Sequence, residues 1–273
     1  MLKMLTRFKP ARYALAALFA LCLPGSALAA SPVLDRIVEK GVLRVAMSTT
    51  QPPYNIRGRD KTVIGFDVDL AQALADAMSV QLEIVEIPFG NLLDTLADDK
   101  VDMVISGLSI TPERSRKVSF VGPYNLSGKS MLTTARIKGV VTDGTEFNDP
   151  DIQIVALENS TSESFVQRNL EDASLHTVPN YDQGIEMLLT GRVDVMVADI
   201  PILKLSMLRY PDAGLGIIEP PLSVEPIGIA IGRQDQPLEN LLRNYLAAFE
   251  KTGLISSLQK KWFEDNSWIA LVP

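Results

Sequence analysis

Short apolar runs rich in valine and isoleucine alternate with helical patterns in the first half of the chain. The run LRVAM (43–47) precedes a helical pattern near 67–78, QLEIVEI (81–87) precedes one near 91–98, and VDMVI (101–105) closes the series. Strands and helices that alternate at this spacing predict a parallel α/β sheet.

The same alternation restarts in the second half of the chain. The apolar runs IQIVAL (152–157), LHTV (175–178) and VDVMVA (193–198) are separated by helical patterns near 162–169 and 182–190. A strand-helix series that occurs twice is typical of two α/β units. The sequence therefore predicts an α/β fold with two lobes.

Two further strands are expected to connect the lobes. KSMLTTA (129–135) leads from the first series into a loop rich in glycine, aspartate and asparagine (139–151), and SVEPIGIAIG (223–232) follows the second series. The amphipathic helical region 236–264 then needs an apolar surface to cover. We expect this region to return to the first lobe.

This path predicts a discontinuous first lobe (31–131 and 225–273), an inserted second lobe (132–224) and a hinge made of the two connecting strands. A weak internal repeat supports two similar lobes, because LLDTLADDKVDMVISG aligns with GIEMLLTGRVDVMVAD. The alignment places Asp102 over Asp194.

The first thirty residues are organised like a secretory signal peptide. Four cations without an acid precede an apolar segment (13–23) and a run of small residues that ends in Ala29 and Ala30. The segment is shorter than the roughly 20 residues that a membrane-spanning helix needs, so we expect cleavage after residue 29 or 30 and a periplasmic location. Cys22 follows Leu21, where lipoprotein signals have a small residue, so a lipid anchor is not expected.

The chain that follows the signal peptide is acidic and has no cysteine. Removal of the four signal-peptide cations leaves 22 Lys and Arg against 33 Asp and Glu, a net charge of −11. A nucleic-acid partner is not expected at this charge, because phosphate binding needs a basic surface. Without disulfides, an exported protein of this size must rest on a hydrophobic core.

The polar stretch SGLSITPERSRKVSF (106–120) follows a predicted strand end, which is where open parallel sheets bind ligands. Thr-Pro-Glu at 111–113 is a helix-start signature, which puts Arg114 in the first turn of a short helix. Its planar guanidinium suits bidentate binding of a carboxylate. For Arg116 and Lys117 we expect a solvated surface instead, and the local pattern leaves both interpretations open for Arg114.

A second helix start lies in NSTSESF (159–165). Ser160 and Glu163 have the spacing of a capping box, in which each side chain binds the other's backbone N–H. The N–H groups around Thr161 are then available to an anion at the positive end of the helix. Taken in isolation, the pattern favours an ordinary cap. Combined with Arg114, however, the helix start can clamp a carboxylate between the lobes.

Asp199 ends the stretch VDVMVAD, and two roles compete for it. It can hold an ammonium group, or it can cap the helix that is expected to begin at Ile200. Gln51 and Tyr54 follow the first predicted strand and Phe89 follows the second. Each aromatic ring can line a cleft or belong to the core.

Residues for catalytic and metal sites are scarce. His176 is the single histidine and is expected on the surface of its strand, and no cysteine follows the signal peptide. Neither a Cys/His pair nor a histidine-rich metal site can therefore be built, and no glycine-rich phosphate-binding motif is present. We expect no cofactor and no metal.

These stretches together resemble the family 3 extracellular solute-binding proteins, the periplasmic amino-acid receptors of ABC importers. The resemblance rests on LRVAMSTTQPPY, GFDVDLAQALA, KVDMVISGLSITPERSRKVSFVGPY, NSTSESF, GRVDVMVAD and KKWFED. It implies a periplasmic-binding-protein fold, in which two α/β lobes joined by two hinge strands close on a ligand.

The resemblance also implies roles for individual residues. Arg114 would bind the α-carboxylate of the ligand and Asp199 its α-ammonium group. The further positions that it implies for ligand binding are Ser109, the backbone at Gly107 and Thr161, and, at the side-chain pocket, Gln51, Tyr54 and Phe89. Gln51 and Asn125 stand where relatives often have an aromatic residue, and Asn159 replaces a glycine.

The expected function is the capture of an amino acid or related zwitterion by a monomer that delivers it to the permease of an ABC importer in the inner membrane. A cyclohexadienyl dehydratase-like enzyme on the same fold is the first alternative. Dehydration needs a further acid or base in the cleft to move a proton. We expect none there, because no acid follows Asp199 before Asp212. A sensor that reports a ligand to a signalling partner is the second alternative.

Overall fold

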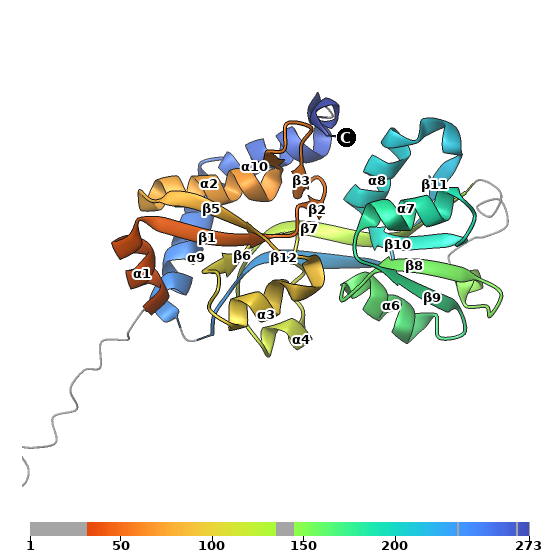
Figure 1. Ribbon diagram of the computed structural model, residues 1–273, viewed down its shortest axis with the longest axis horizontal. Coiled ribbons are helices and arrows are strands. Elements are labelled where there is room, and N and C mark those ends of the chain that lie inside the picture. The colour runs from red at the N-terminus through yellow and green to blue at the C-terminus, as the bar shows by residue number, and fades with distance from the viewer. Residues whose placement is uncertain (1–31, 135–144, 234, 266, 273) are drawn as a thin grey trace, which may run out of the picture. The chain divides into compact units, whose positions relative to one another are not determined.

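Two long antiparallel strands connect the two halves of one large sheet (Figure 1). The computed structural model describes residues 32–134, 145–233, 235–265 and 267–272, which belong to one compact unit. Strand β7 (Ser119–Thr134) pairs with β12 (Ser223–Ile231). The strand order is β5-β1-β6-β12-β7-β10-β8-β9, with β11 beside β7.

Lobe 1 is built on three parallel strands, β1 (Val42–Met47), β5 (Gln81–Glu86) and β6 (Met103–Val104). Its first helices are α1 (Pro32–Lys40), α2 (Phe66–Met78), α3 (Leu92–Ala97) and α4 (Pro112–Ser115), with a 3-10 turn at Phe89–Asn91. A small separate sheet contains β2 (Thr50–Gln51), β3 (Asn55–Arg57) and β4 (Val63–Ile64). This is the predicted order of strands and helices.

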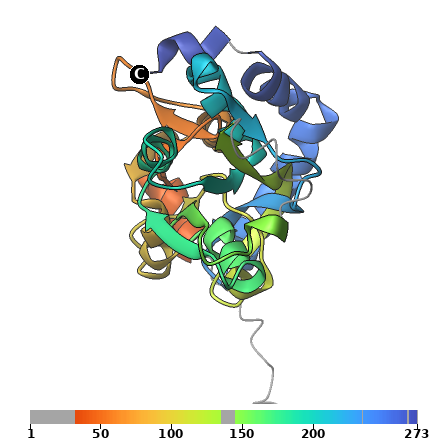
Figure 2. The same ribbon diagram turned by 90° about the vertical axis from the view of Figure 1, so that its right-hand side faces the viewer.

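Lobe 2 repeats the arrangement with the parallel strands β8 (Gln153–Leu157), β9 (Ser174–Val178) and β10 (Val195–Asp199). Its helices are α6 (Thr161–Asn169), α7 (Tyr181–Leu189) and α8 (Ile200–Arg209), with 3-10 turns at Thr145–Phe147 and Pro211–Ala213 and the short strand β11 (Leu215–Ile217). In Figure 2, which turns lobe 2 toward the viewer, the green helix α6 lies on one side of the strands and α7 and α8 on the other.

The C-terminal helices return to lobe 1, as predicted. Helix α9 (Gln236–Lys251) is followed by α10 (Leu254–Gln259), a π-helical turn (Lys260–Glu264) and a 3-10 helix (Ser267–Leu271). Gly253 separates α9 from α10 with φ = +80°, a conformation that suits glycine at a helix end. The apolar residues Leu238, Leu242, Ile255, Leu258 and Trp262 join the core that contains β1 and α2.

Alternating side chains divide the buried residues between the two faces of the sheet. In β1, Leu43, Val45 and Met47 join the core under α2 and α9, whereas Ala46 joins the core on the α3 side. This period of two is the geometry of a strand, and it explains why valine and isoleucine fill these runs. Both faces are covered by helices, so the strands read as nearly continuous apolar runs.

The internal repeat is confirmed by matching hydrogen bonds in the two lobes. Asp102 accepts a hydrogen bond from the backbone N of Arg44 through its carboxylate (2.8 Å), and its own N donates to the O of Arg44 (2.9 Å). Asp194 makes the same pair of bonds to Gln153, at 2.9 and 2.8 Å. Each aspartate therefore ties the start of the third strand of its lobe to the first strand.

Some predictions fall outside the described residues. The signal peptide (1–30) and residues 139–144 of the predicted loop 139–151 belong to this group. The residue boundaries of the lobes stay a prediction. Within the described ranges, no helix is long and apolar enough to cross a membrane.

Candidate functional site

The candidate site lies where the ends of β6 and β10 meet the connecting strands β7 and β12. The predicted segment after β6 provides Gly107, Ser109 and Arg114, and the N-terminus of α6 provides Thr161. Four charged residues gather between them and are named the charged cluster: Arg114, Lys129, Asp199 and Glu225. Two of these four were not predicted.

Arg114 lies at the contact between the lobes without an acidic partner. Thr111 caps helix α4 as predicted and accepts a hydrogen bond from the N of Arg114 (3.1 Å). The guanidinium donates to the backbone oxygens of Ser109 (3.0 Å) and Asn159 (3.3 Å), and it lies 5.7 Å from the centre of the Phe89 ring. Among the described residues it makes no ion pair, and burial lowers its pKa. Its charge is therefore available to an anion.

Glu225 bridges the two lobes through hydroxyl groups. Its Oε2 accepts hydrogen bonds from Ser109 of lobe 1 (2.6 Å) and from Thr161 of lobe 2 (2.8 Å). These are two of the residues that the family resemblance assigned to a ligand. The carboxylate of Glu225 therefore occupies both hydroxyl donors in this structure.

Lys129 is a buried cation that holds the two acids of the cluster. Its side chain is 1% exposed, and its Nζ lies 2.7 Å from Glu225 and 3.5 Å from Asp199. The Nζ also donates to the hydroxyl of Thr161 (2.9 Å). A lysine that is buried to this degree normally needs such partners, because an unpaired buried charge costs several kcal/mol.

Burial and neighbouring charges act in opposite directions on the acids of the cluster. Burial raises the pKa of Asp199, and the cation Lys129 only partly offsets the effect. For Glu225, burial also opposes ionisation, but Lys129 and the hydroxyls of Ser109 and Thr161 outweigh it and hold the pKa below its usual value. Glu225 is thus the more firmly ionised acid, and Asp199 shares Lys129 with it at a longer distance.

The structure decides between the two predicted roles of Asp199. It precedes α8 at the N-cap position, but its side chain makes no capping hydrogen bond. Its carboxylate points instead toward Lys129. The capping interpretation is therefore wrong, and the acid belongs to the cleft.

The capping box at α6 is only partly as predicted. Ser160 accepts from the N of Glu163 (3.1 Å), but the Glu163 side chain accepts from the N of Asn159 (2.5 Å) instead of that of Ser160. Asn159 has φ = +56°, which turns its own N–H toward the glutamate. The helix start remains positioned beside the charged cluster.

A buried hydrogen-bond network fixes the backbone at Gly107. Asp67, fully buried on α2, accepts from the N of Gly107 (2.7 Å), from Asn55 (2.9 Å) and from the hydroxyl of Tyr124 (2.8 Å). Gly107 has φ = +57°, and a Cβ there would lie 3.0 Å from the Tyr54 ring. Glycine is required on both counts.

Tyr54 packs within the core of lobe 1. Its side chain is fully buried, and its ring packs edge-on against Phe66 and Phe263. Its hydroxyl accepts a hydrogen bond from Asn125 (3.1 Å), and burial followed by the charge of Asp199 raises its pKa. The ring of Tyr54 therefore forms part of the floor of the site, and its hydroxyl points toward Asn125.

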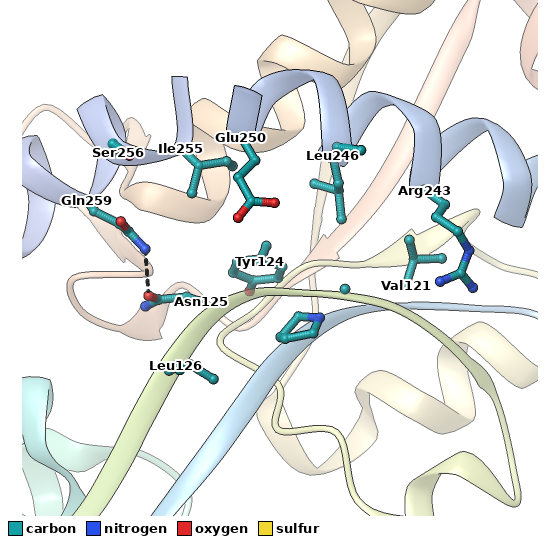
Figure 3. Close-up of a pocket in the computed structure, with 13 residues that line it drawn as sticks. Val121, Tyr124, Asn125, Leu126, Arg243, Leu246, Glu250, Ile255, Ser256 and Gln259 are labelled. Atoms are coloured by element: carbon teal, nitrogen blue, oxygen red, sulfur yellow. Dashed lines mark hydrogen bonds between the residues drawn. The ribbon is translucent and has the colours of Figure 1, made fainter. Parts of the chain in front are cut away.

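Two cavities flank this floor. One, of about 510 Å³, lies between β7 and helices α9 and α10, where Gln259 donates to Asn125 (3.1 Å) (Figure 3). The other, of about 330 Å³, is lined by Thr49 and Tyr181 together with apolar residues of both lobes. Burial, followed by the charge of Asp199, raises the pKa of Tyr181, so this tyrosine lies within electrostatic range of the charged cluster. The second cavity therefore adjoins the charged cluster.

Gln51 and Phe89 flank the same region. Gln51 is buried, and its Nε2 has no hydrogen bond of standard geometry to the described residues. Phe89 packs against Arg114. Arg116 and Lys117 are exposed as predicted, and His176 lies exposed on β9, bonded to Gln153 (2.8 Å).

Sequence reasoning missed Lys129, Glu225 and Tyr181. The expectation that no further acid or base joins the cleft is wrong, because Glu225 and Lys129 reach it from β12 and β7. A signal was present: Lys129 and Glu225 are each the single charged residue of their strand. Among the described residues, no group of three potential metal ligands is found.

Asp67 gives the site a predicted pH dependence. Burial raises its pKa from 3.8 to about 6, so the folded protein binds its proton more tightly than the unfolded chain does. The stability contributed by Asp67 is full below the unfolded pKa and falls by about 3 kcal/mol as the pH rises through about 6. Denaturant unfolding of the wild type and Asp67→Asn at several pH values measures this loss. The free energy of unfolding of the wild type should fall relative to that of Asp67→Asn as the pH rises through about 6. A difference that is independent of pH would contradict the assignment.

Comparison with known proteins agrees with this architecture. The model of the bacterial extracellular solute-binding proteins, family 3, matches residues 43–265. Cyclohexadienyl dehydratase of Pseudomonas aeruginosa is 29% identical over 231 residues, covering 85% of this chain and 86% of that protein. The L-arginine-binding protein of the same species is 31% identical over 235 residues, covering 81% and 87%.

A solved structure shows the same fold. The putative binding component of an ABC transporter from Wolinella succinogenes, complexed with lysine, is 30% identical and superposes with a TM-score of 0.81, covering 85% of this chain and 99% of that one. The fold is therefore the two-lobed α/β fold of periplasmic binding proteins with two hinge strands, as predicted. With a family match over most of its length, the chain belongs to the bacterial extracellular solute-binding proteins, family 3.

Proposed function

We propose that the protein captures an amino acid in the cleft between its lobes. The observation that carries this proposal is the pair formed by Arg114 and Asp199. Arg114 is a half-buried cation that forms no ion pair among the described residues, and Asp199 is a buried acid that caps no helix and lies 3.5 Å from Lys129. A zwitterion supplies one group of each kind that these two residues need. Arg114 would bind the carboxylate, and Asp199 the ammonium group.

Both lobes would contact the bound carboxylate. Arg114 is already joined to lobe 2 through Asn159, and Ser109 and Thr161 face each other across Glu225. The backbone at Gly107 and Thr161 would add hydrogen bonds, with Gln51, Tyr54 and Phe89 near the ligand side chain. Because one ligand group would contact both lobes, its binding would favour closure about β7 and β12.

The relatives support an amino-acid ligand. Proteins named for arginine and for cystine match more than four fifths of the chain. By analogy with these proteins, the chain would be exported through cleavage of its signal peptide, act as a periplasmic monomer and deliver its ligand to an ABC permease.

An enzyme is the second candidate, and the charged cluster favours it. Lys129 and Glu225 supply the ionisable groups that a dehydratase would need for proton transfer, at the same end of the cleft as Asp199. Cyclohexadienyl dehydratase is among the relatives. The pairing of Lys129 with Glu225 favours the binding protein, because an ion pair leaves neither group free to transfer a proton.

Two measurements on the protein without its signal peptide separate these functions. A thermal-shift screen of amino acids should identify a ligand, because a ligand at ~100 times its Kd adds about 2.7 kcal/mol of stability. Incubation with prephenate should give no phenylpyruvate above the rate of a heat-denatured sample. Product formation that Glu225→Gln abolishes would establish the enzyme instead.

A further inference from the structure

We propose that the ligand is an amino acid with an uncharged side chain, carrying one carboxylate, one ammonium group and no third charge. The inference rests on the proposed function and names the ligand class of the same site. It follows from how the charges of the described residues are already paired.

Lys129 and Glu225 neutralise each other within the protein. Their charged atoms are 2.7 Å apart, and the lysine is almost completely buried. They stand on the adjacent strands β7 and β12, where Lys129 is in register with Ser223 and Glu225 with Ser127. The pair therefore joins the two connecting strands and carries no net charge.

The rest of the charged cluster matches two ligand charges. The other two members are Arg114, which forms no ion pair among the described residues, and Asp199, which shares Lys129 with Glu225 at the longer distance of 3.5 Å. The α-carboxylate and α-ammonium group of an amino acid satisfy both. A third ligand charge would find no unpaired group of opposite sign in the cluster.

The cavity beside the cluster leads to the same conclusion. Its inner lining includes Pro52, Ile56, Ile185, Ile202 and Leu205, which suit an uncharged side chain. Its charged residues are paired as well. Arg209 donates to Asp182 (2.9 Å), and Arg57 forms an ion pair with Glu86.

Lys129 further disfavours a cationic ligand. Its Nζ lies 3.5 Å from Asp199, so the α-ammonium group must share that carboxylate with a resident cation. A second ligand cation would add another positive charge near Lys129 and Arg114 in a poorly solvated space. Like charges brought together in this way lower affinity strongly, which is how a binding site rejects the wrong ligand.

Isothermal titration of the wild type with matched ligand pairs tests the inference. L-citrulline and L-arginine, L-norleucine and L-lysine, and L-glutamine and L-glutamate each differ mainly in side-chain charge. The uncharged member of each pair should bind at least about tenfold more tightly. Equal or tighter binding of the charged members would overturn the inference and leave the proposed function intact. If no amino acid binds, both fail.

A pair of variants tests the cause. Lys129→Met leaves Glu225 without its cation and should shift the citrulline-to-arginine affinity ratio toward arginine by about tenfold. The double variant Lys129→Met/Glu225→Gln removes both charges and should return the ratio to that of the wild type. An unchanged affinity ratio in Lys129→Met would show that Lys129 does not cause the preference for an uncharged ligand. If this variant does not fold, the wild-type pairs still decide the ligand class.

Discussion

Arg114→Ala should weaken ligand binding by roughly 2 to 5 kcal/mol, measured by isothermal titration. The guanidinium has no acidic partner within the described part of the chain, so the ligand carboxylate would be its first. Removal of the cation leaves that carboxylate desolvated and without an ionic partner. Arg114→Lys should recover only part of the loss, because an ammonium group cannot bind a carboxylate in bidentate fashion.

Arg116→Ala is the matched control for this measurement. Arg116 lies two residues further along the chain and is exposed. Its removal changes the net charge by the same amount, so an effect of overall charge would appear in both variants. Undiminished affinity in Arg114→Ala, or an equal loss in Arg116→Ala, would contradict the role of Arg114.

Lys129→Met should lower the free energy of unfolding by about 3 to 5 kcal/mol. The substitution keeps an unbranched side chain of nearly the same length but removes the cation that holds Glu225 and lies near Asp199. Two acids would then share a buried space without a counter-charge between them. Urea unfolding of the ligand-free protein measures the loss.

Two controls separate this effect from that of a simple lysine deletion. Lys204→Met removes a lysine that is exposed on α8 and should change stability little. Lys129→Met/Glu225→Gln should be more stable than Lys129→Met, because replacing both partners of a buried pair avoids an unpaired charge. If the double variant is no more stable than Lys129→Met, the ion pair with Glu225 does not explain why Lys129 is buried.

The fold was largely predictable because its signals are local. The β1, β5 and β8 runs and helix α2 are visible as short apolar segments and helical periods. The return of α9 and α10 to lobe 1 followed from their amphipathic character, which required an apolar surface. The hydrogen bonds of Asp102 and Asp194 explain why a weak sequence repeat marks equivalent positions.

The candidate site was predictable only where the sequence carries a local signature. The Thr-Pro start of α4 placed Arg114, and the Ser160 cap placed Thr161. The local pattern left open whether Asp199 caps α8 or binds a cation. In the structure its carboxylate lies 3.5 Å from Lys129, a residue that no local pattern links to Asp199. Glu225 is distant in sequence from Lys129 and from Asp199. Only the pairing of distant strands in the folded chain brings the charged cluster together.

The most direct test of a cleft that binds both ends of a zwitterion uses the best ligand from the screen and two of its analogues. One analogue lacks the carboxylate, and the other lacks the ammonium group. Isothermal titration of the wild type should show each analogue binding at least about thirtyfold more weakly than the amino acid, the ratio that about 2 kcal/mol gives. An analogue that binds as tightly as the parent amino acid would contradict the pairing of Arg114 and Asp199 with the two ends of the ligand.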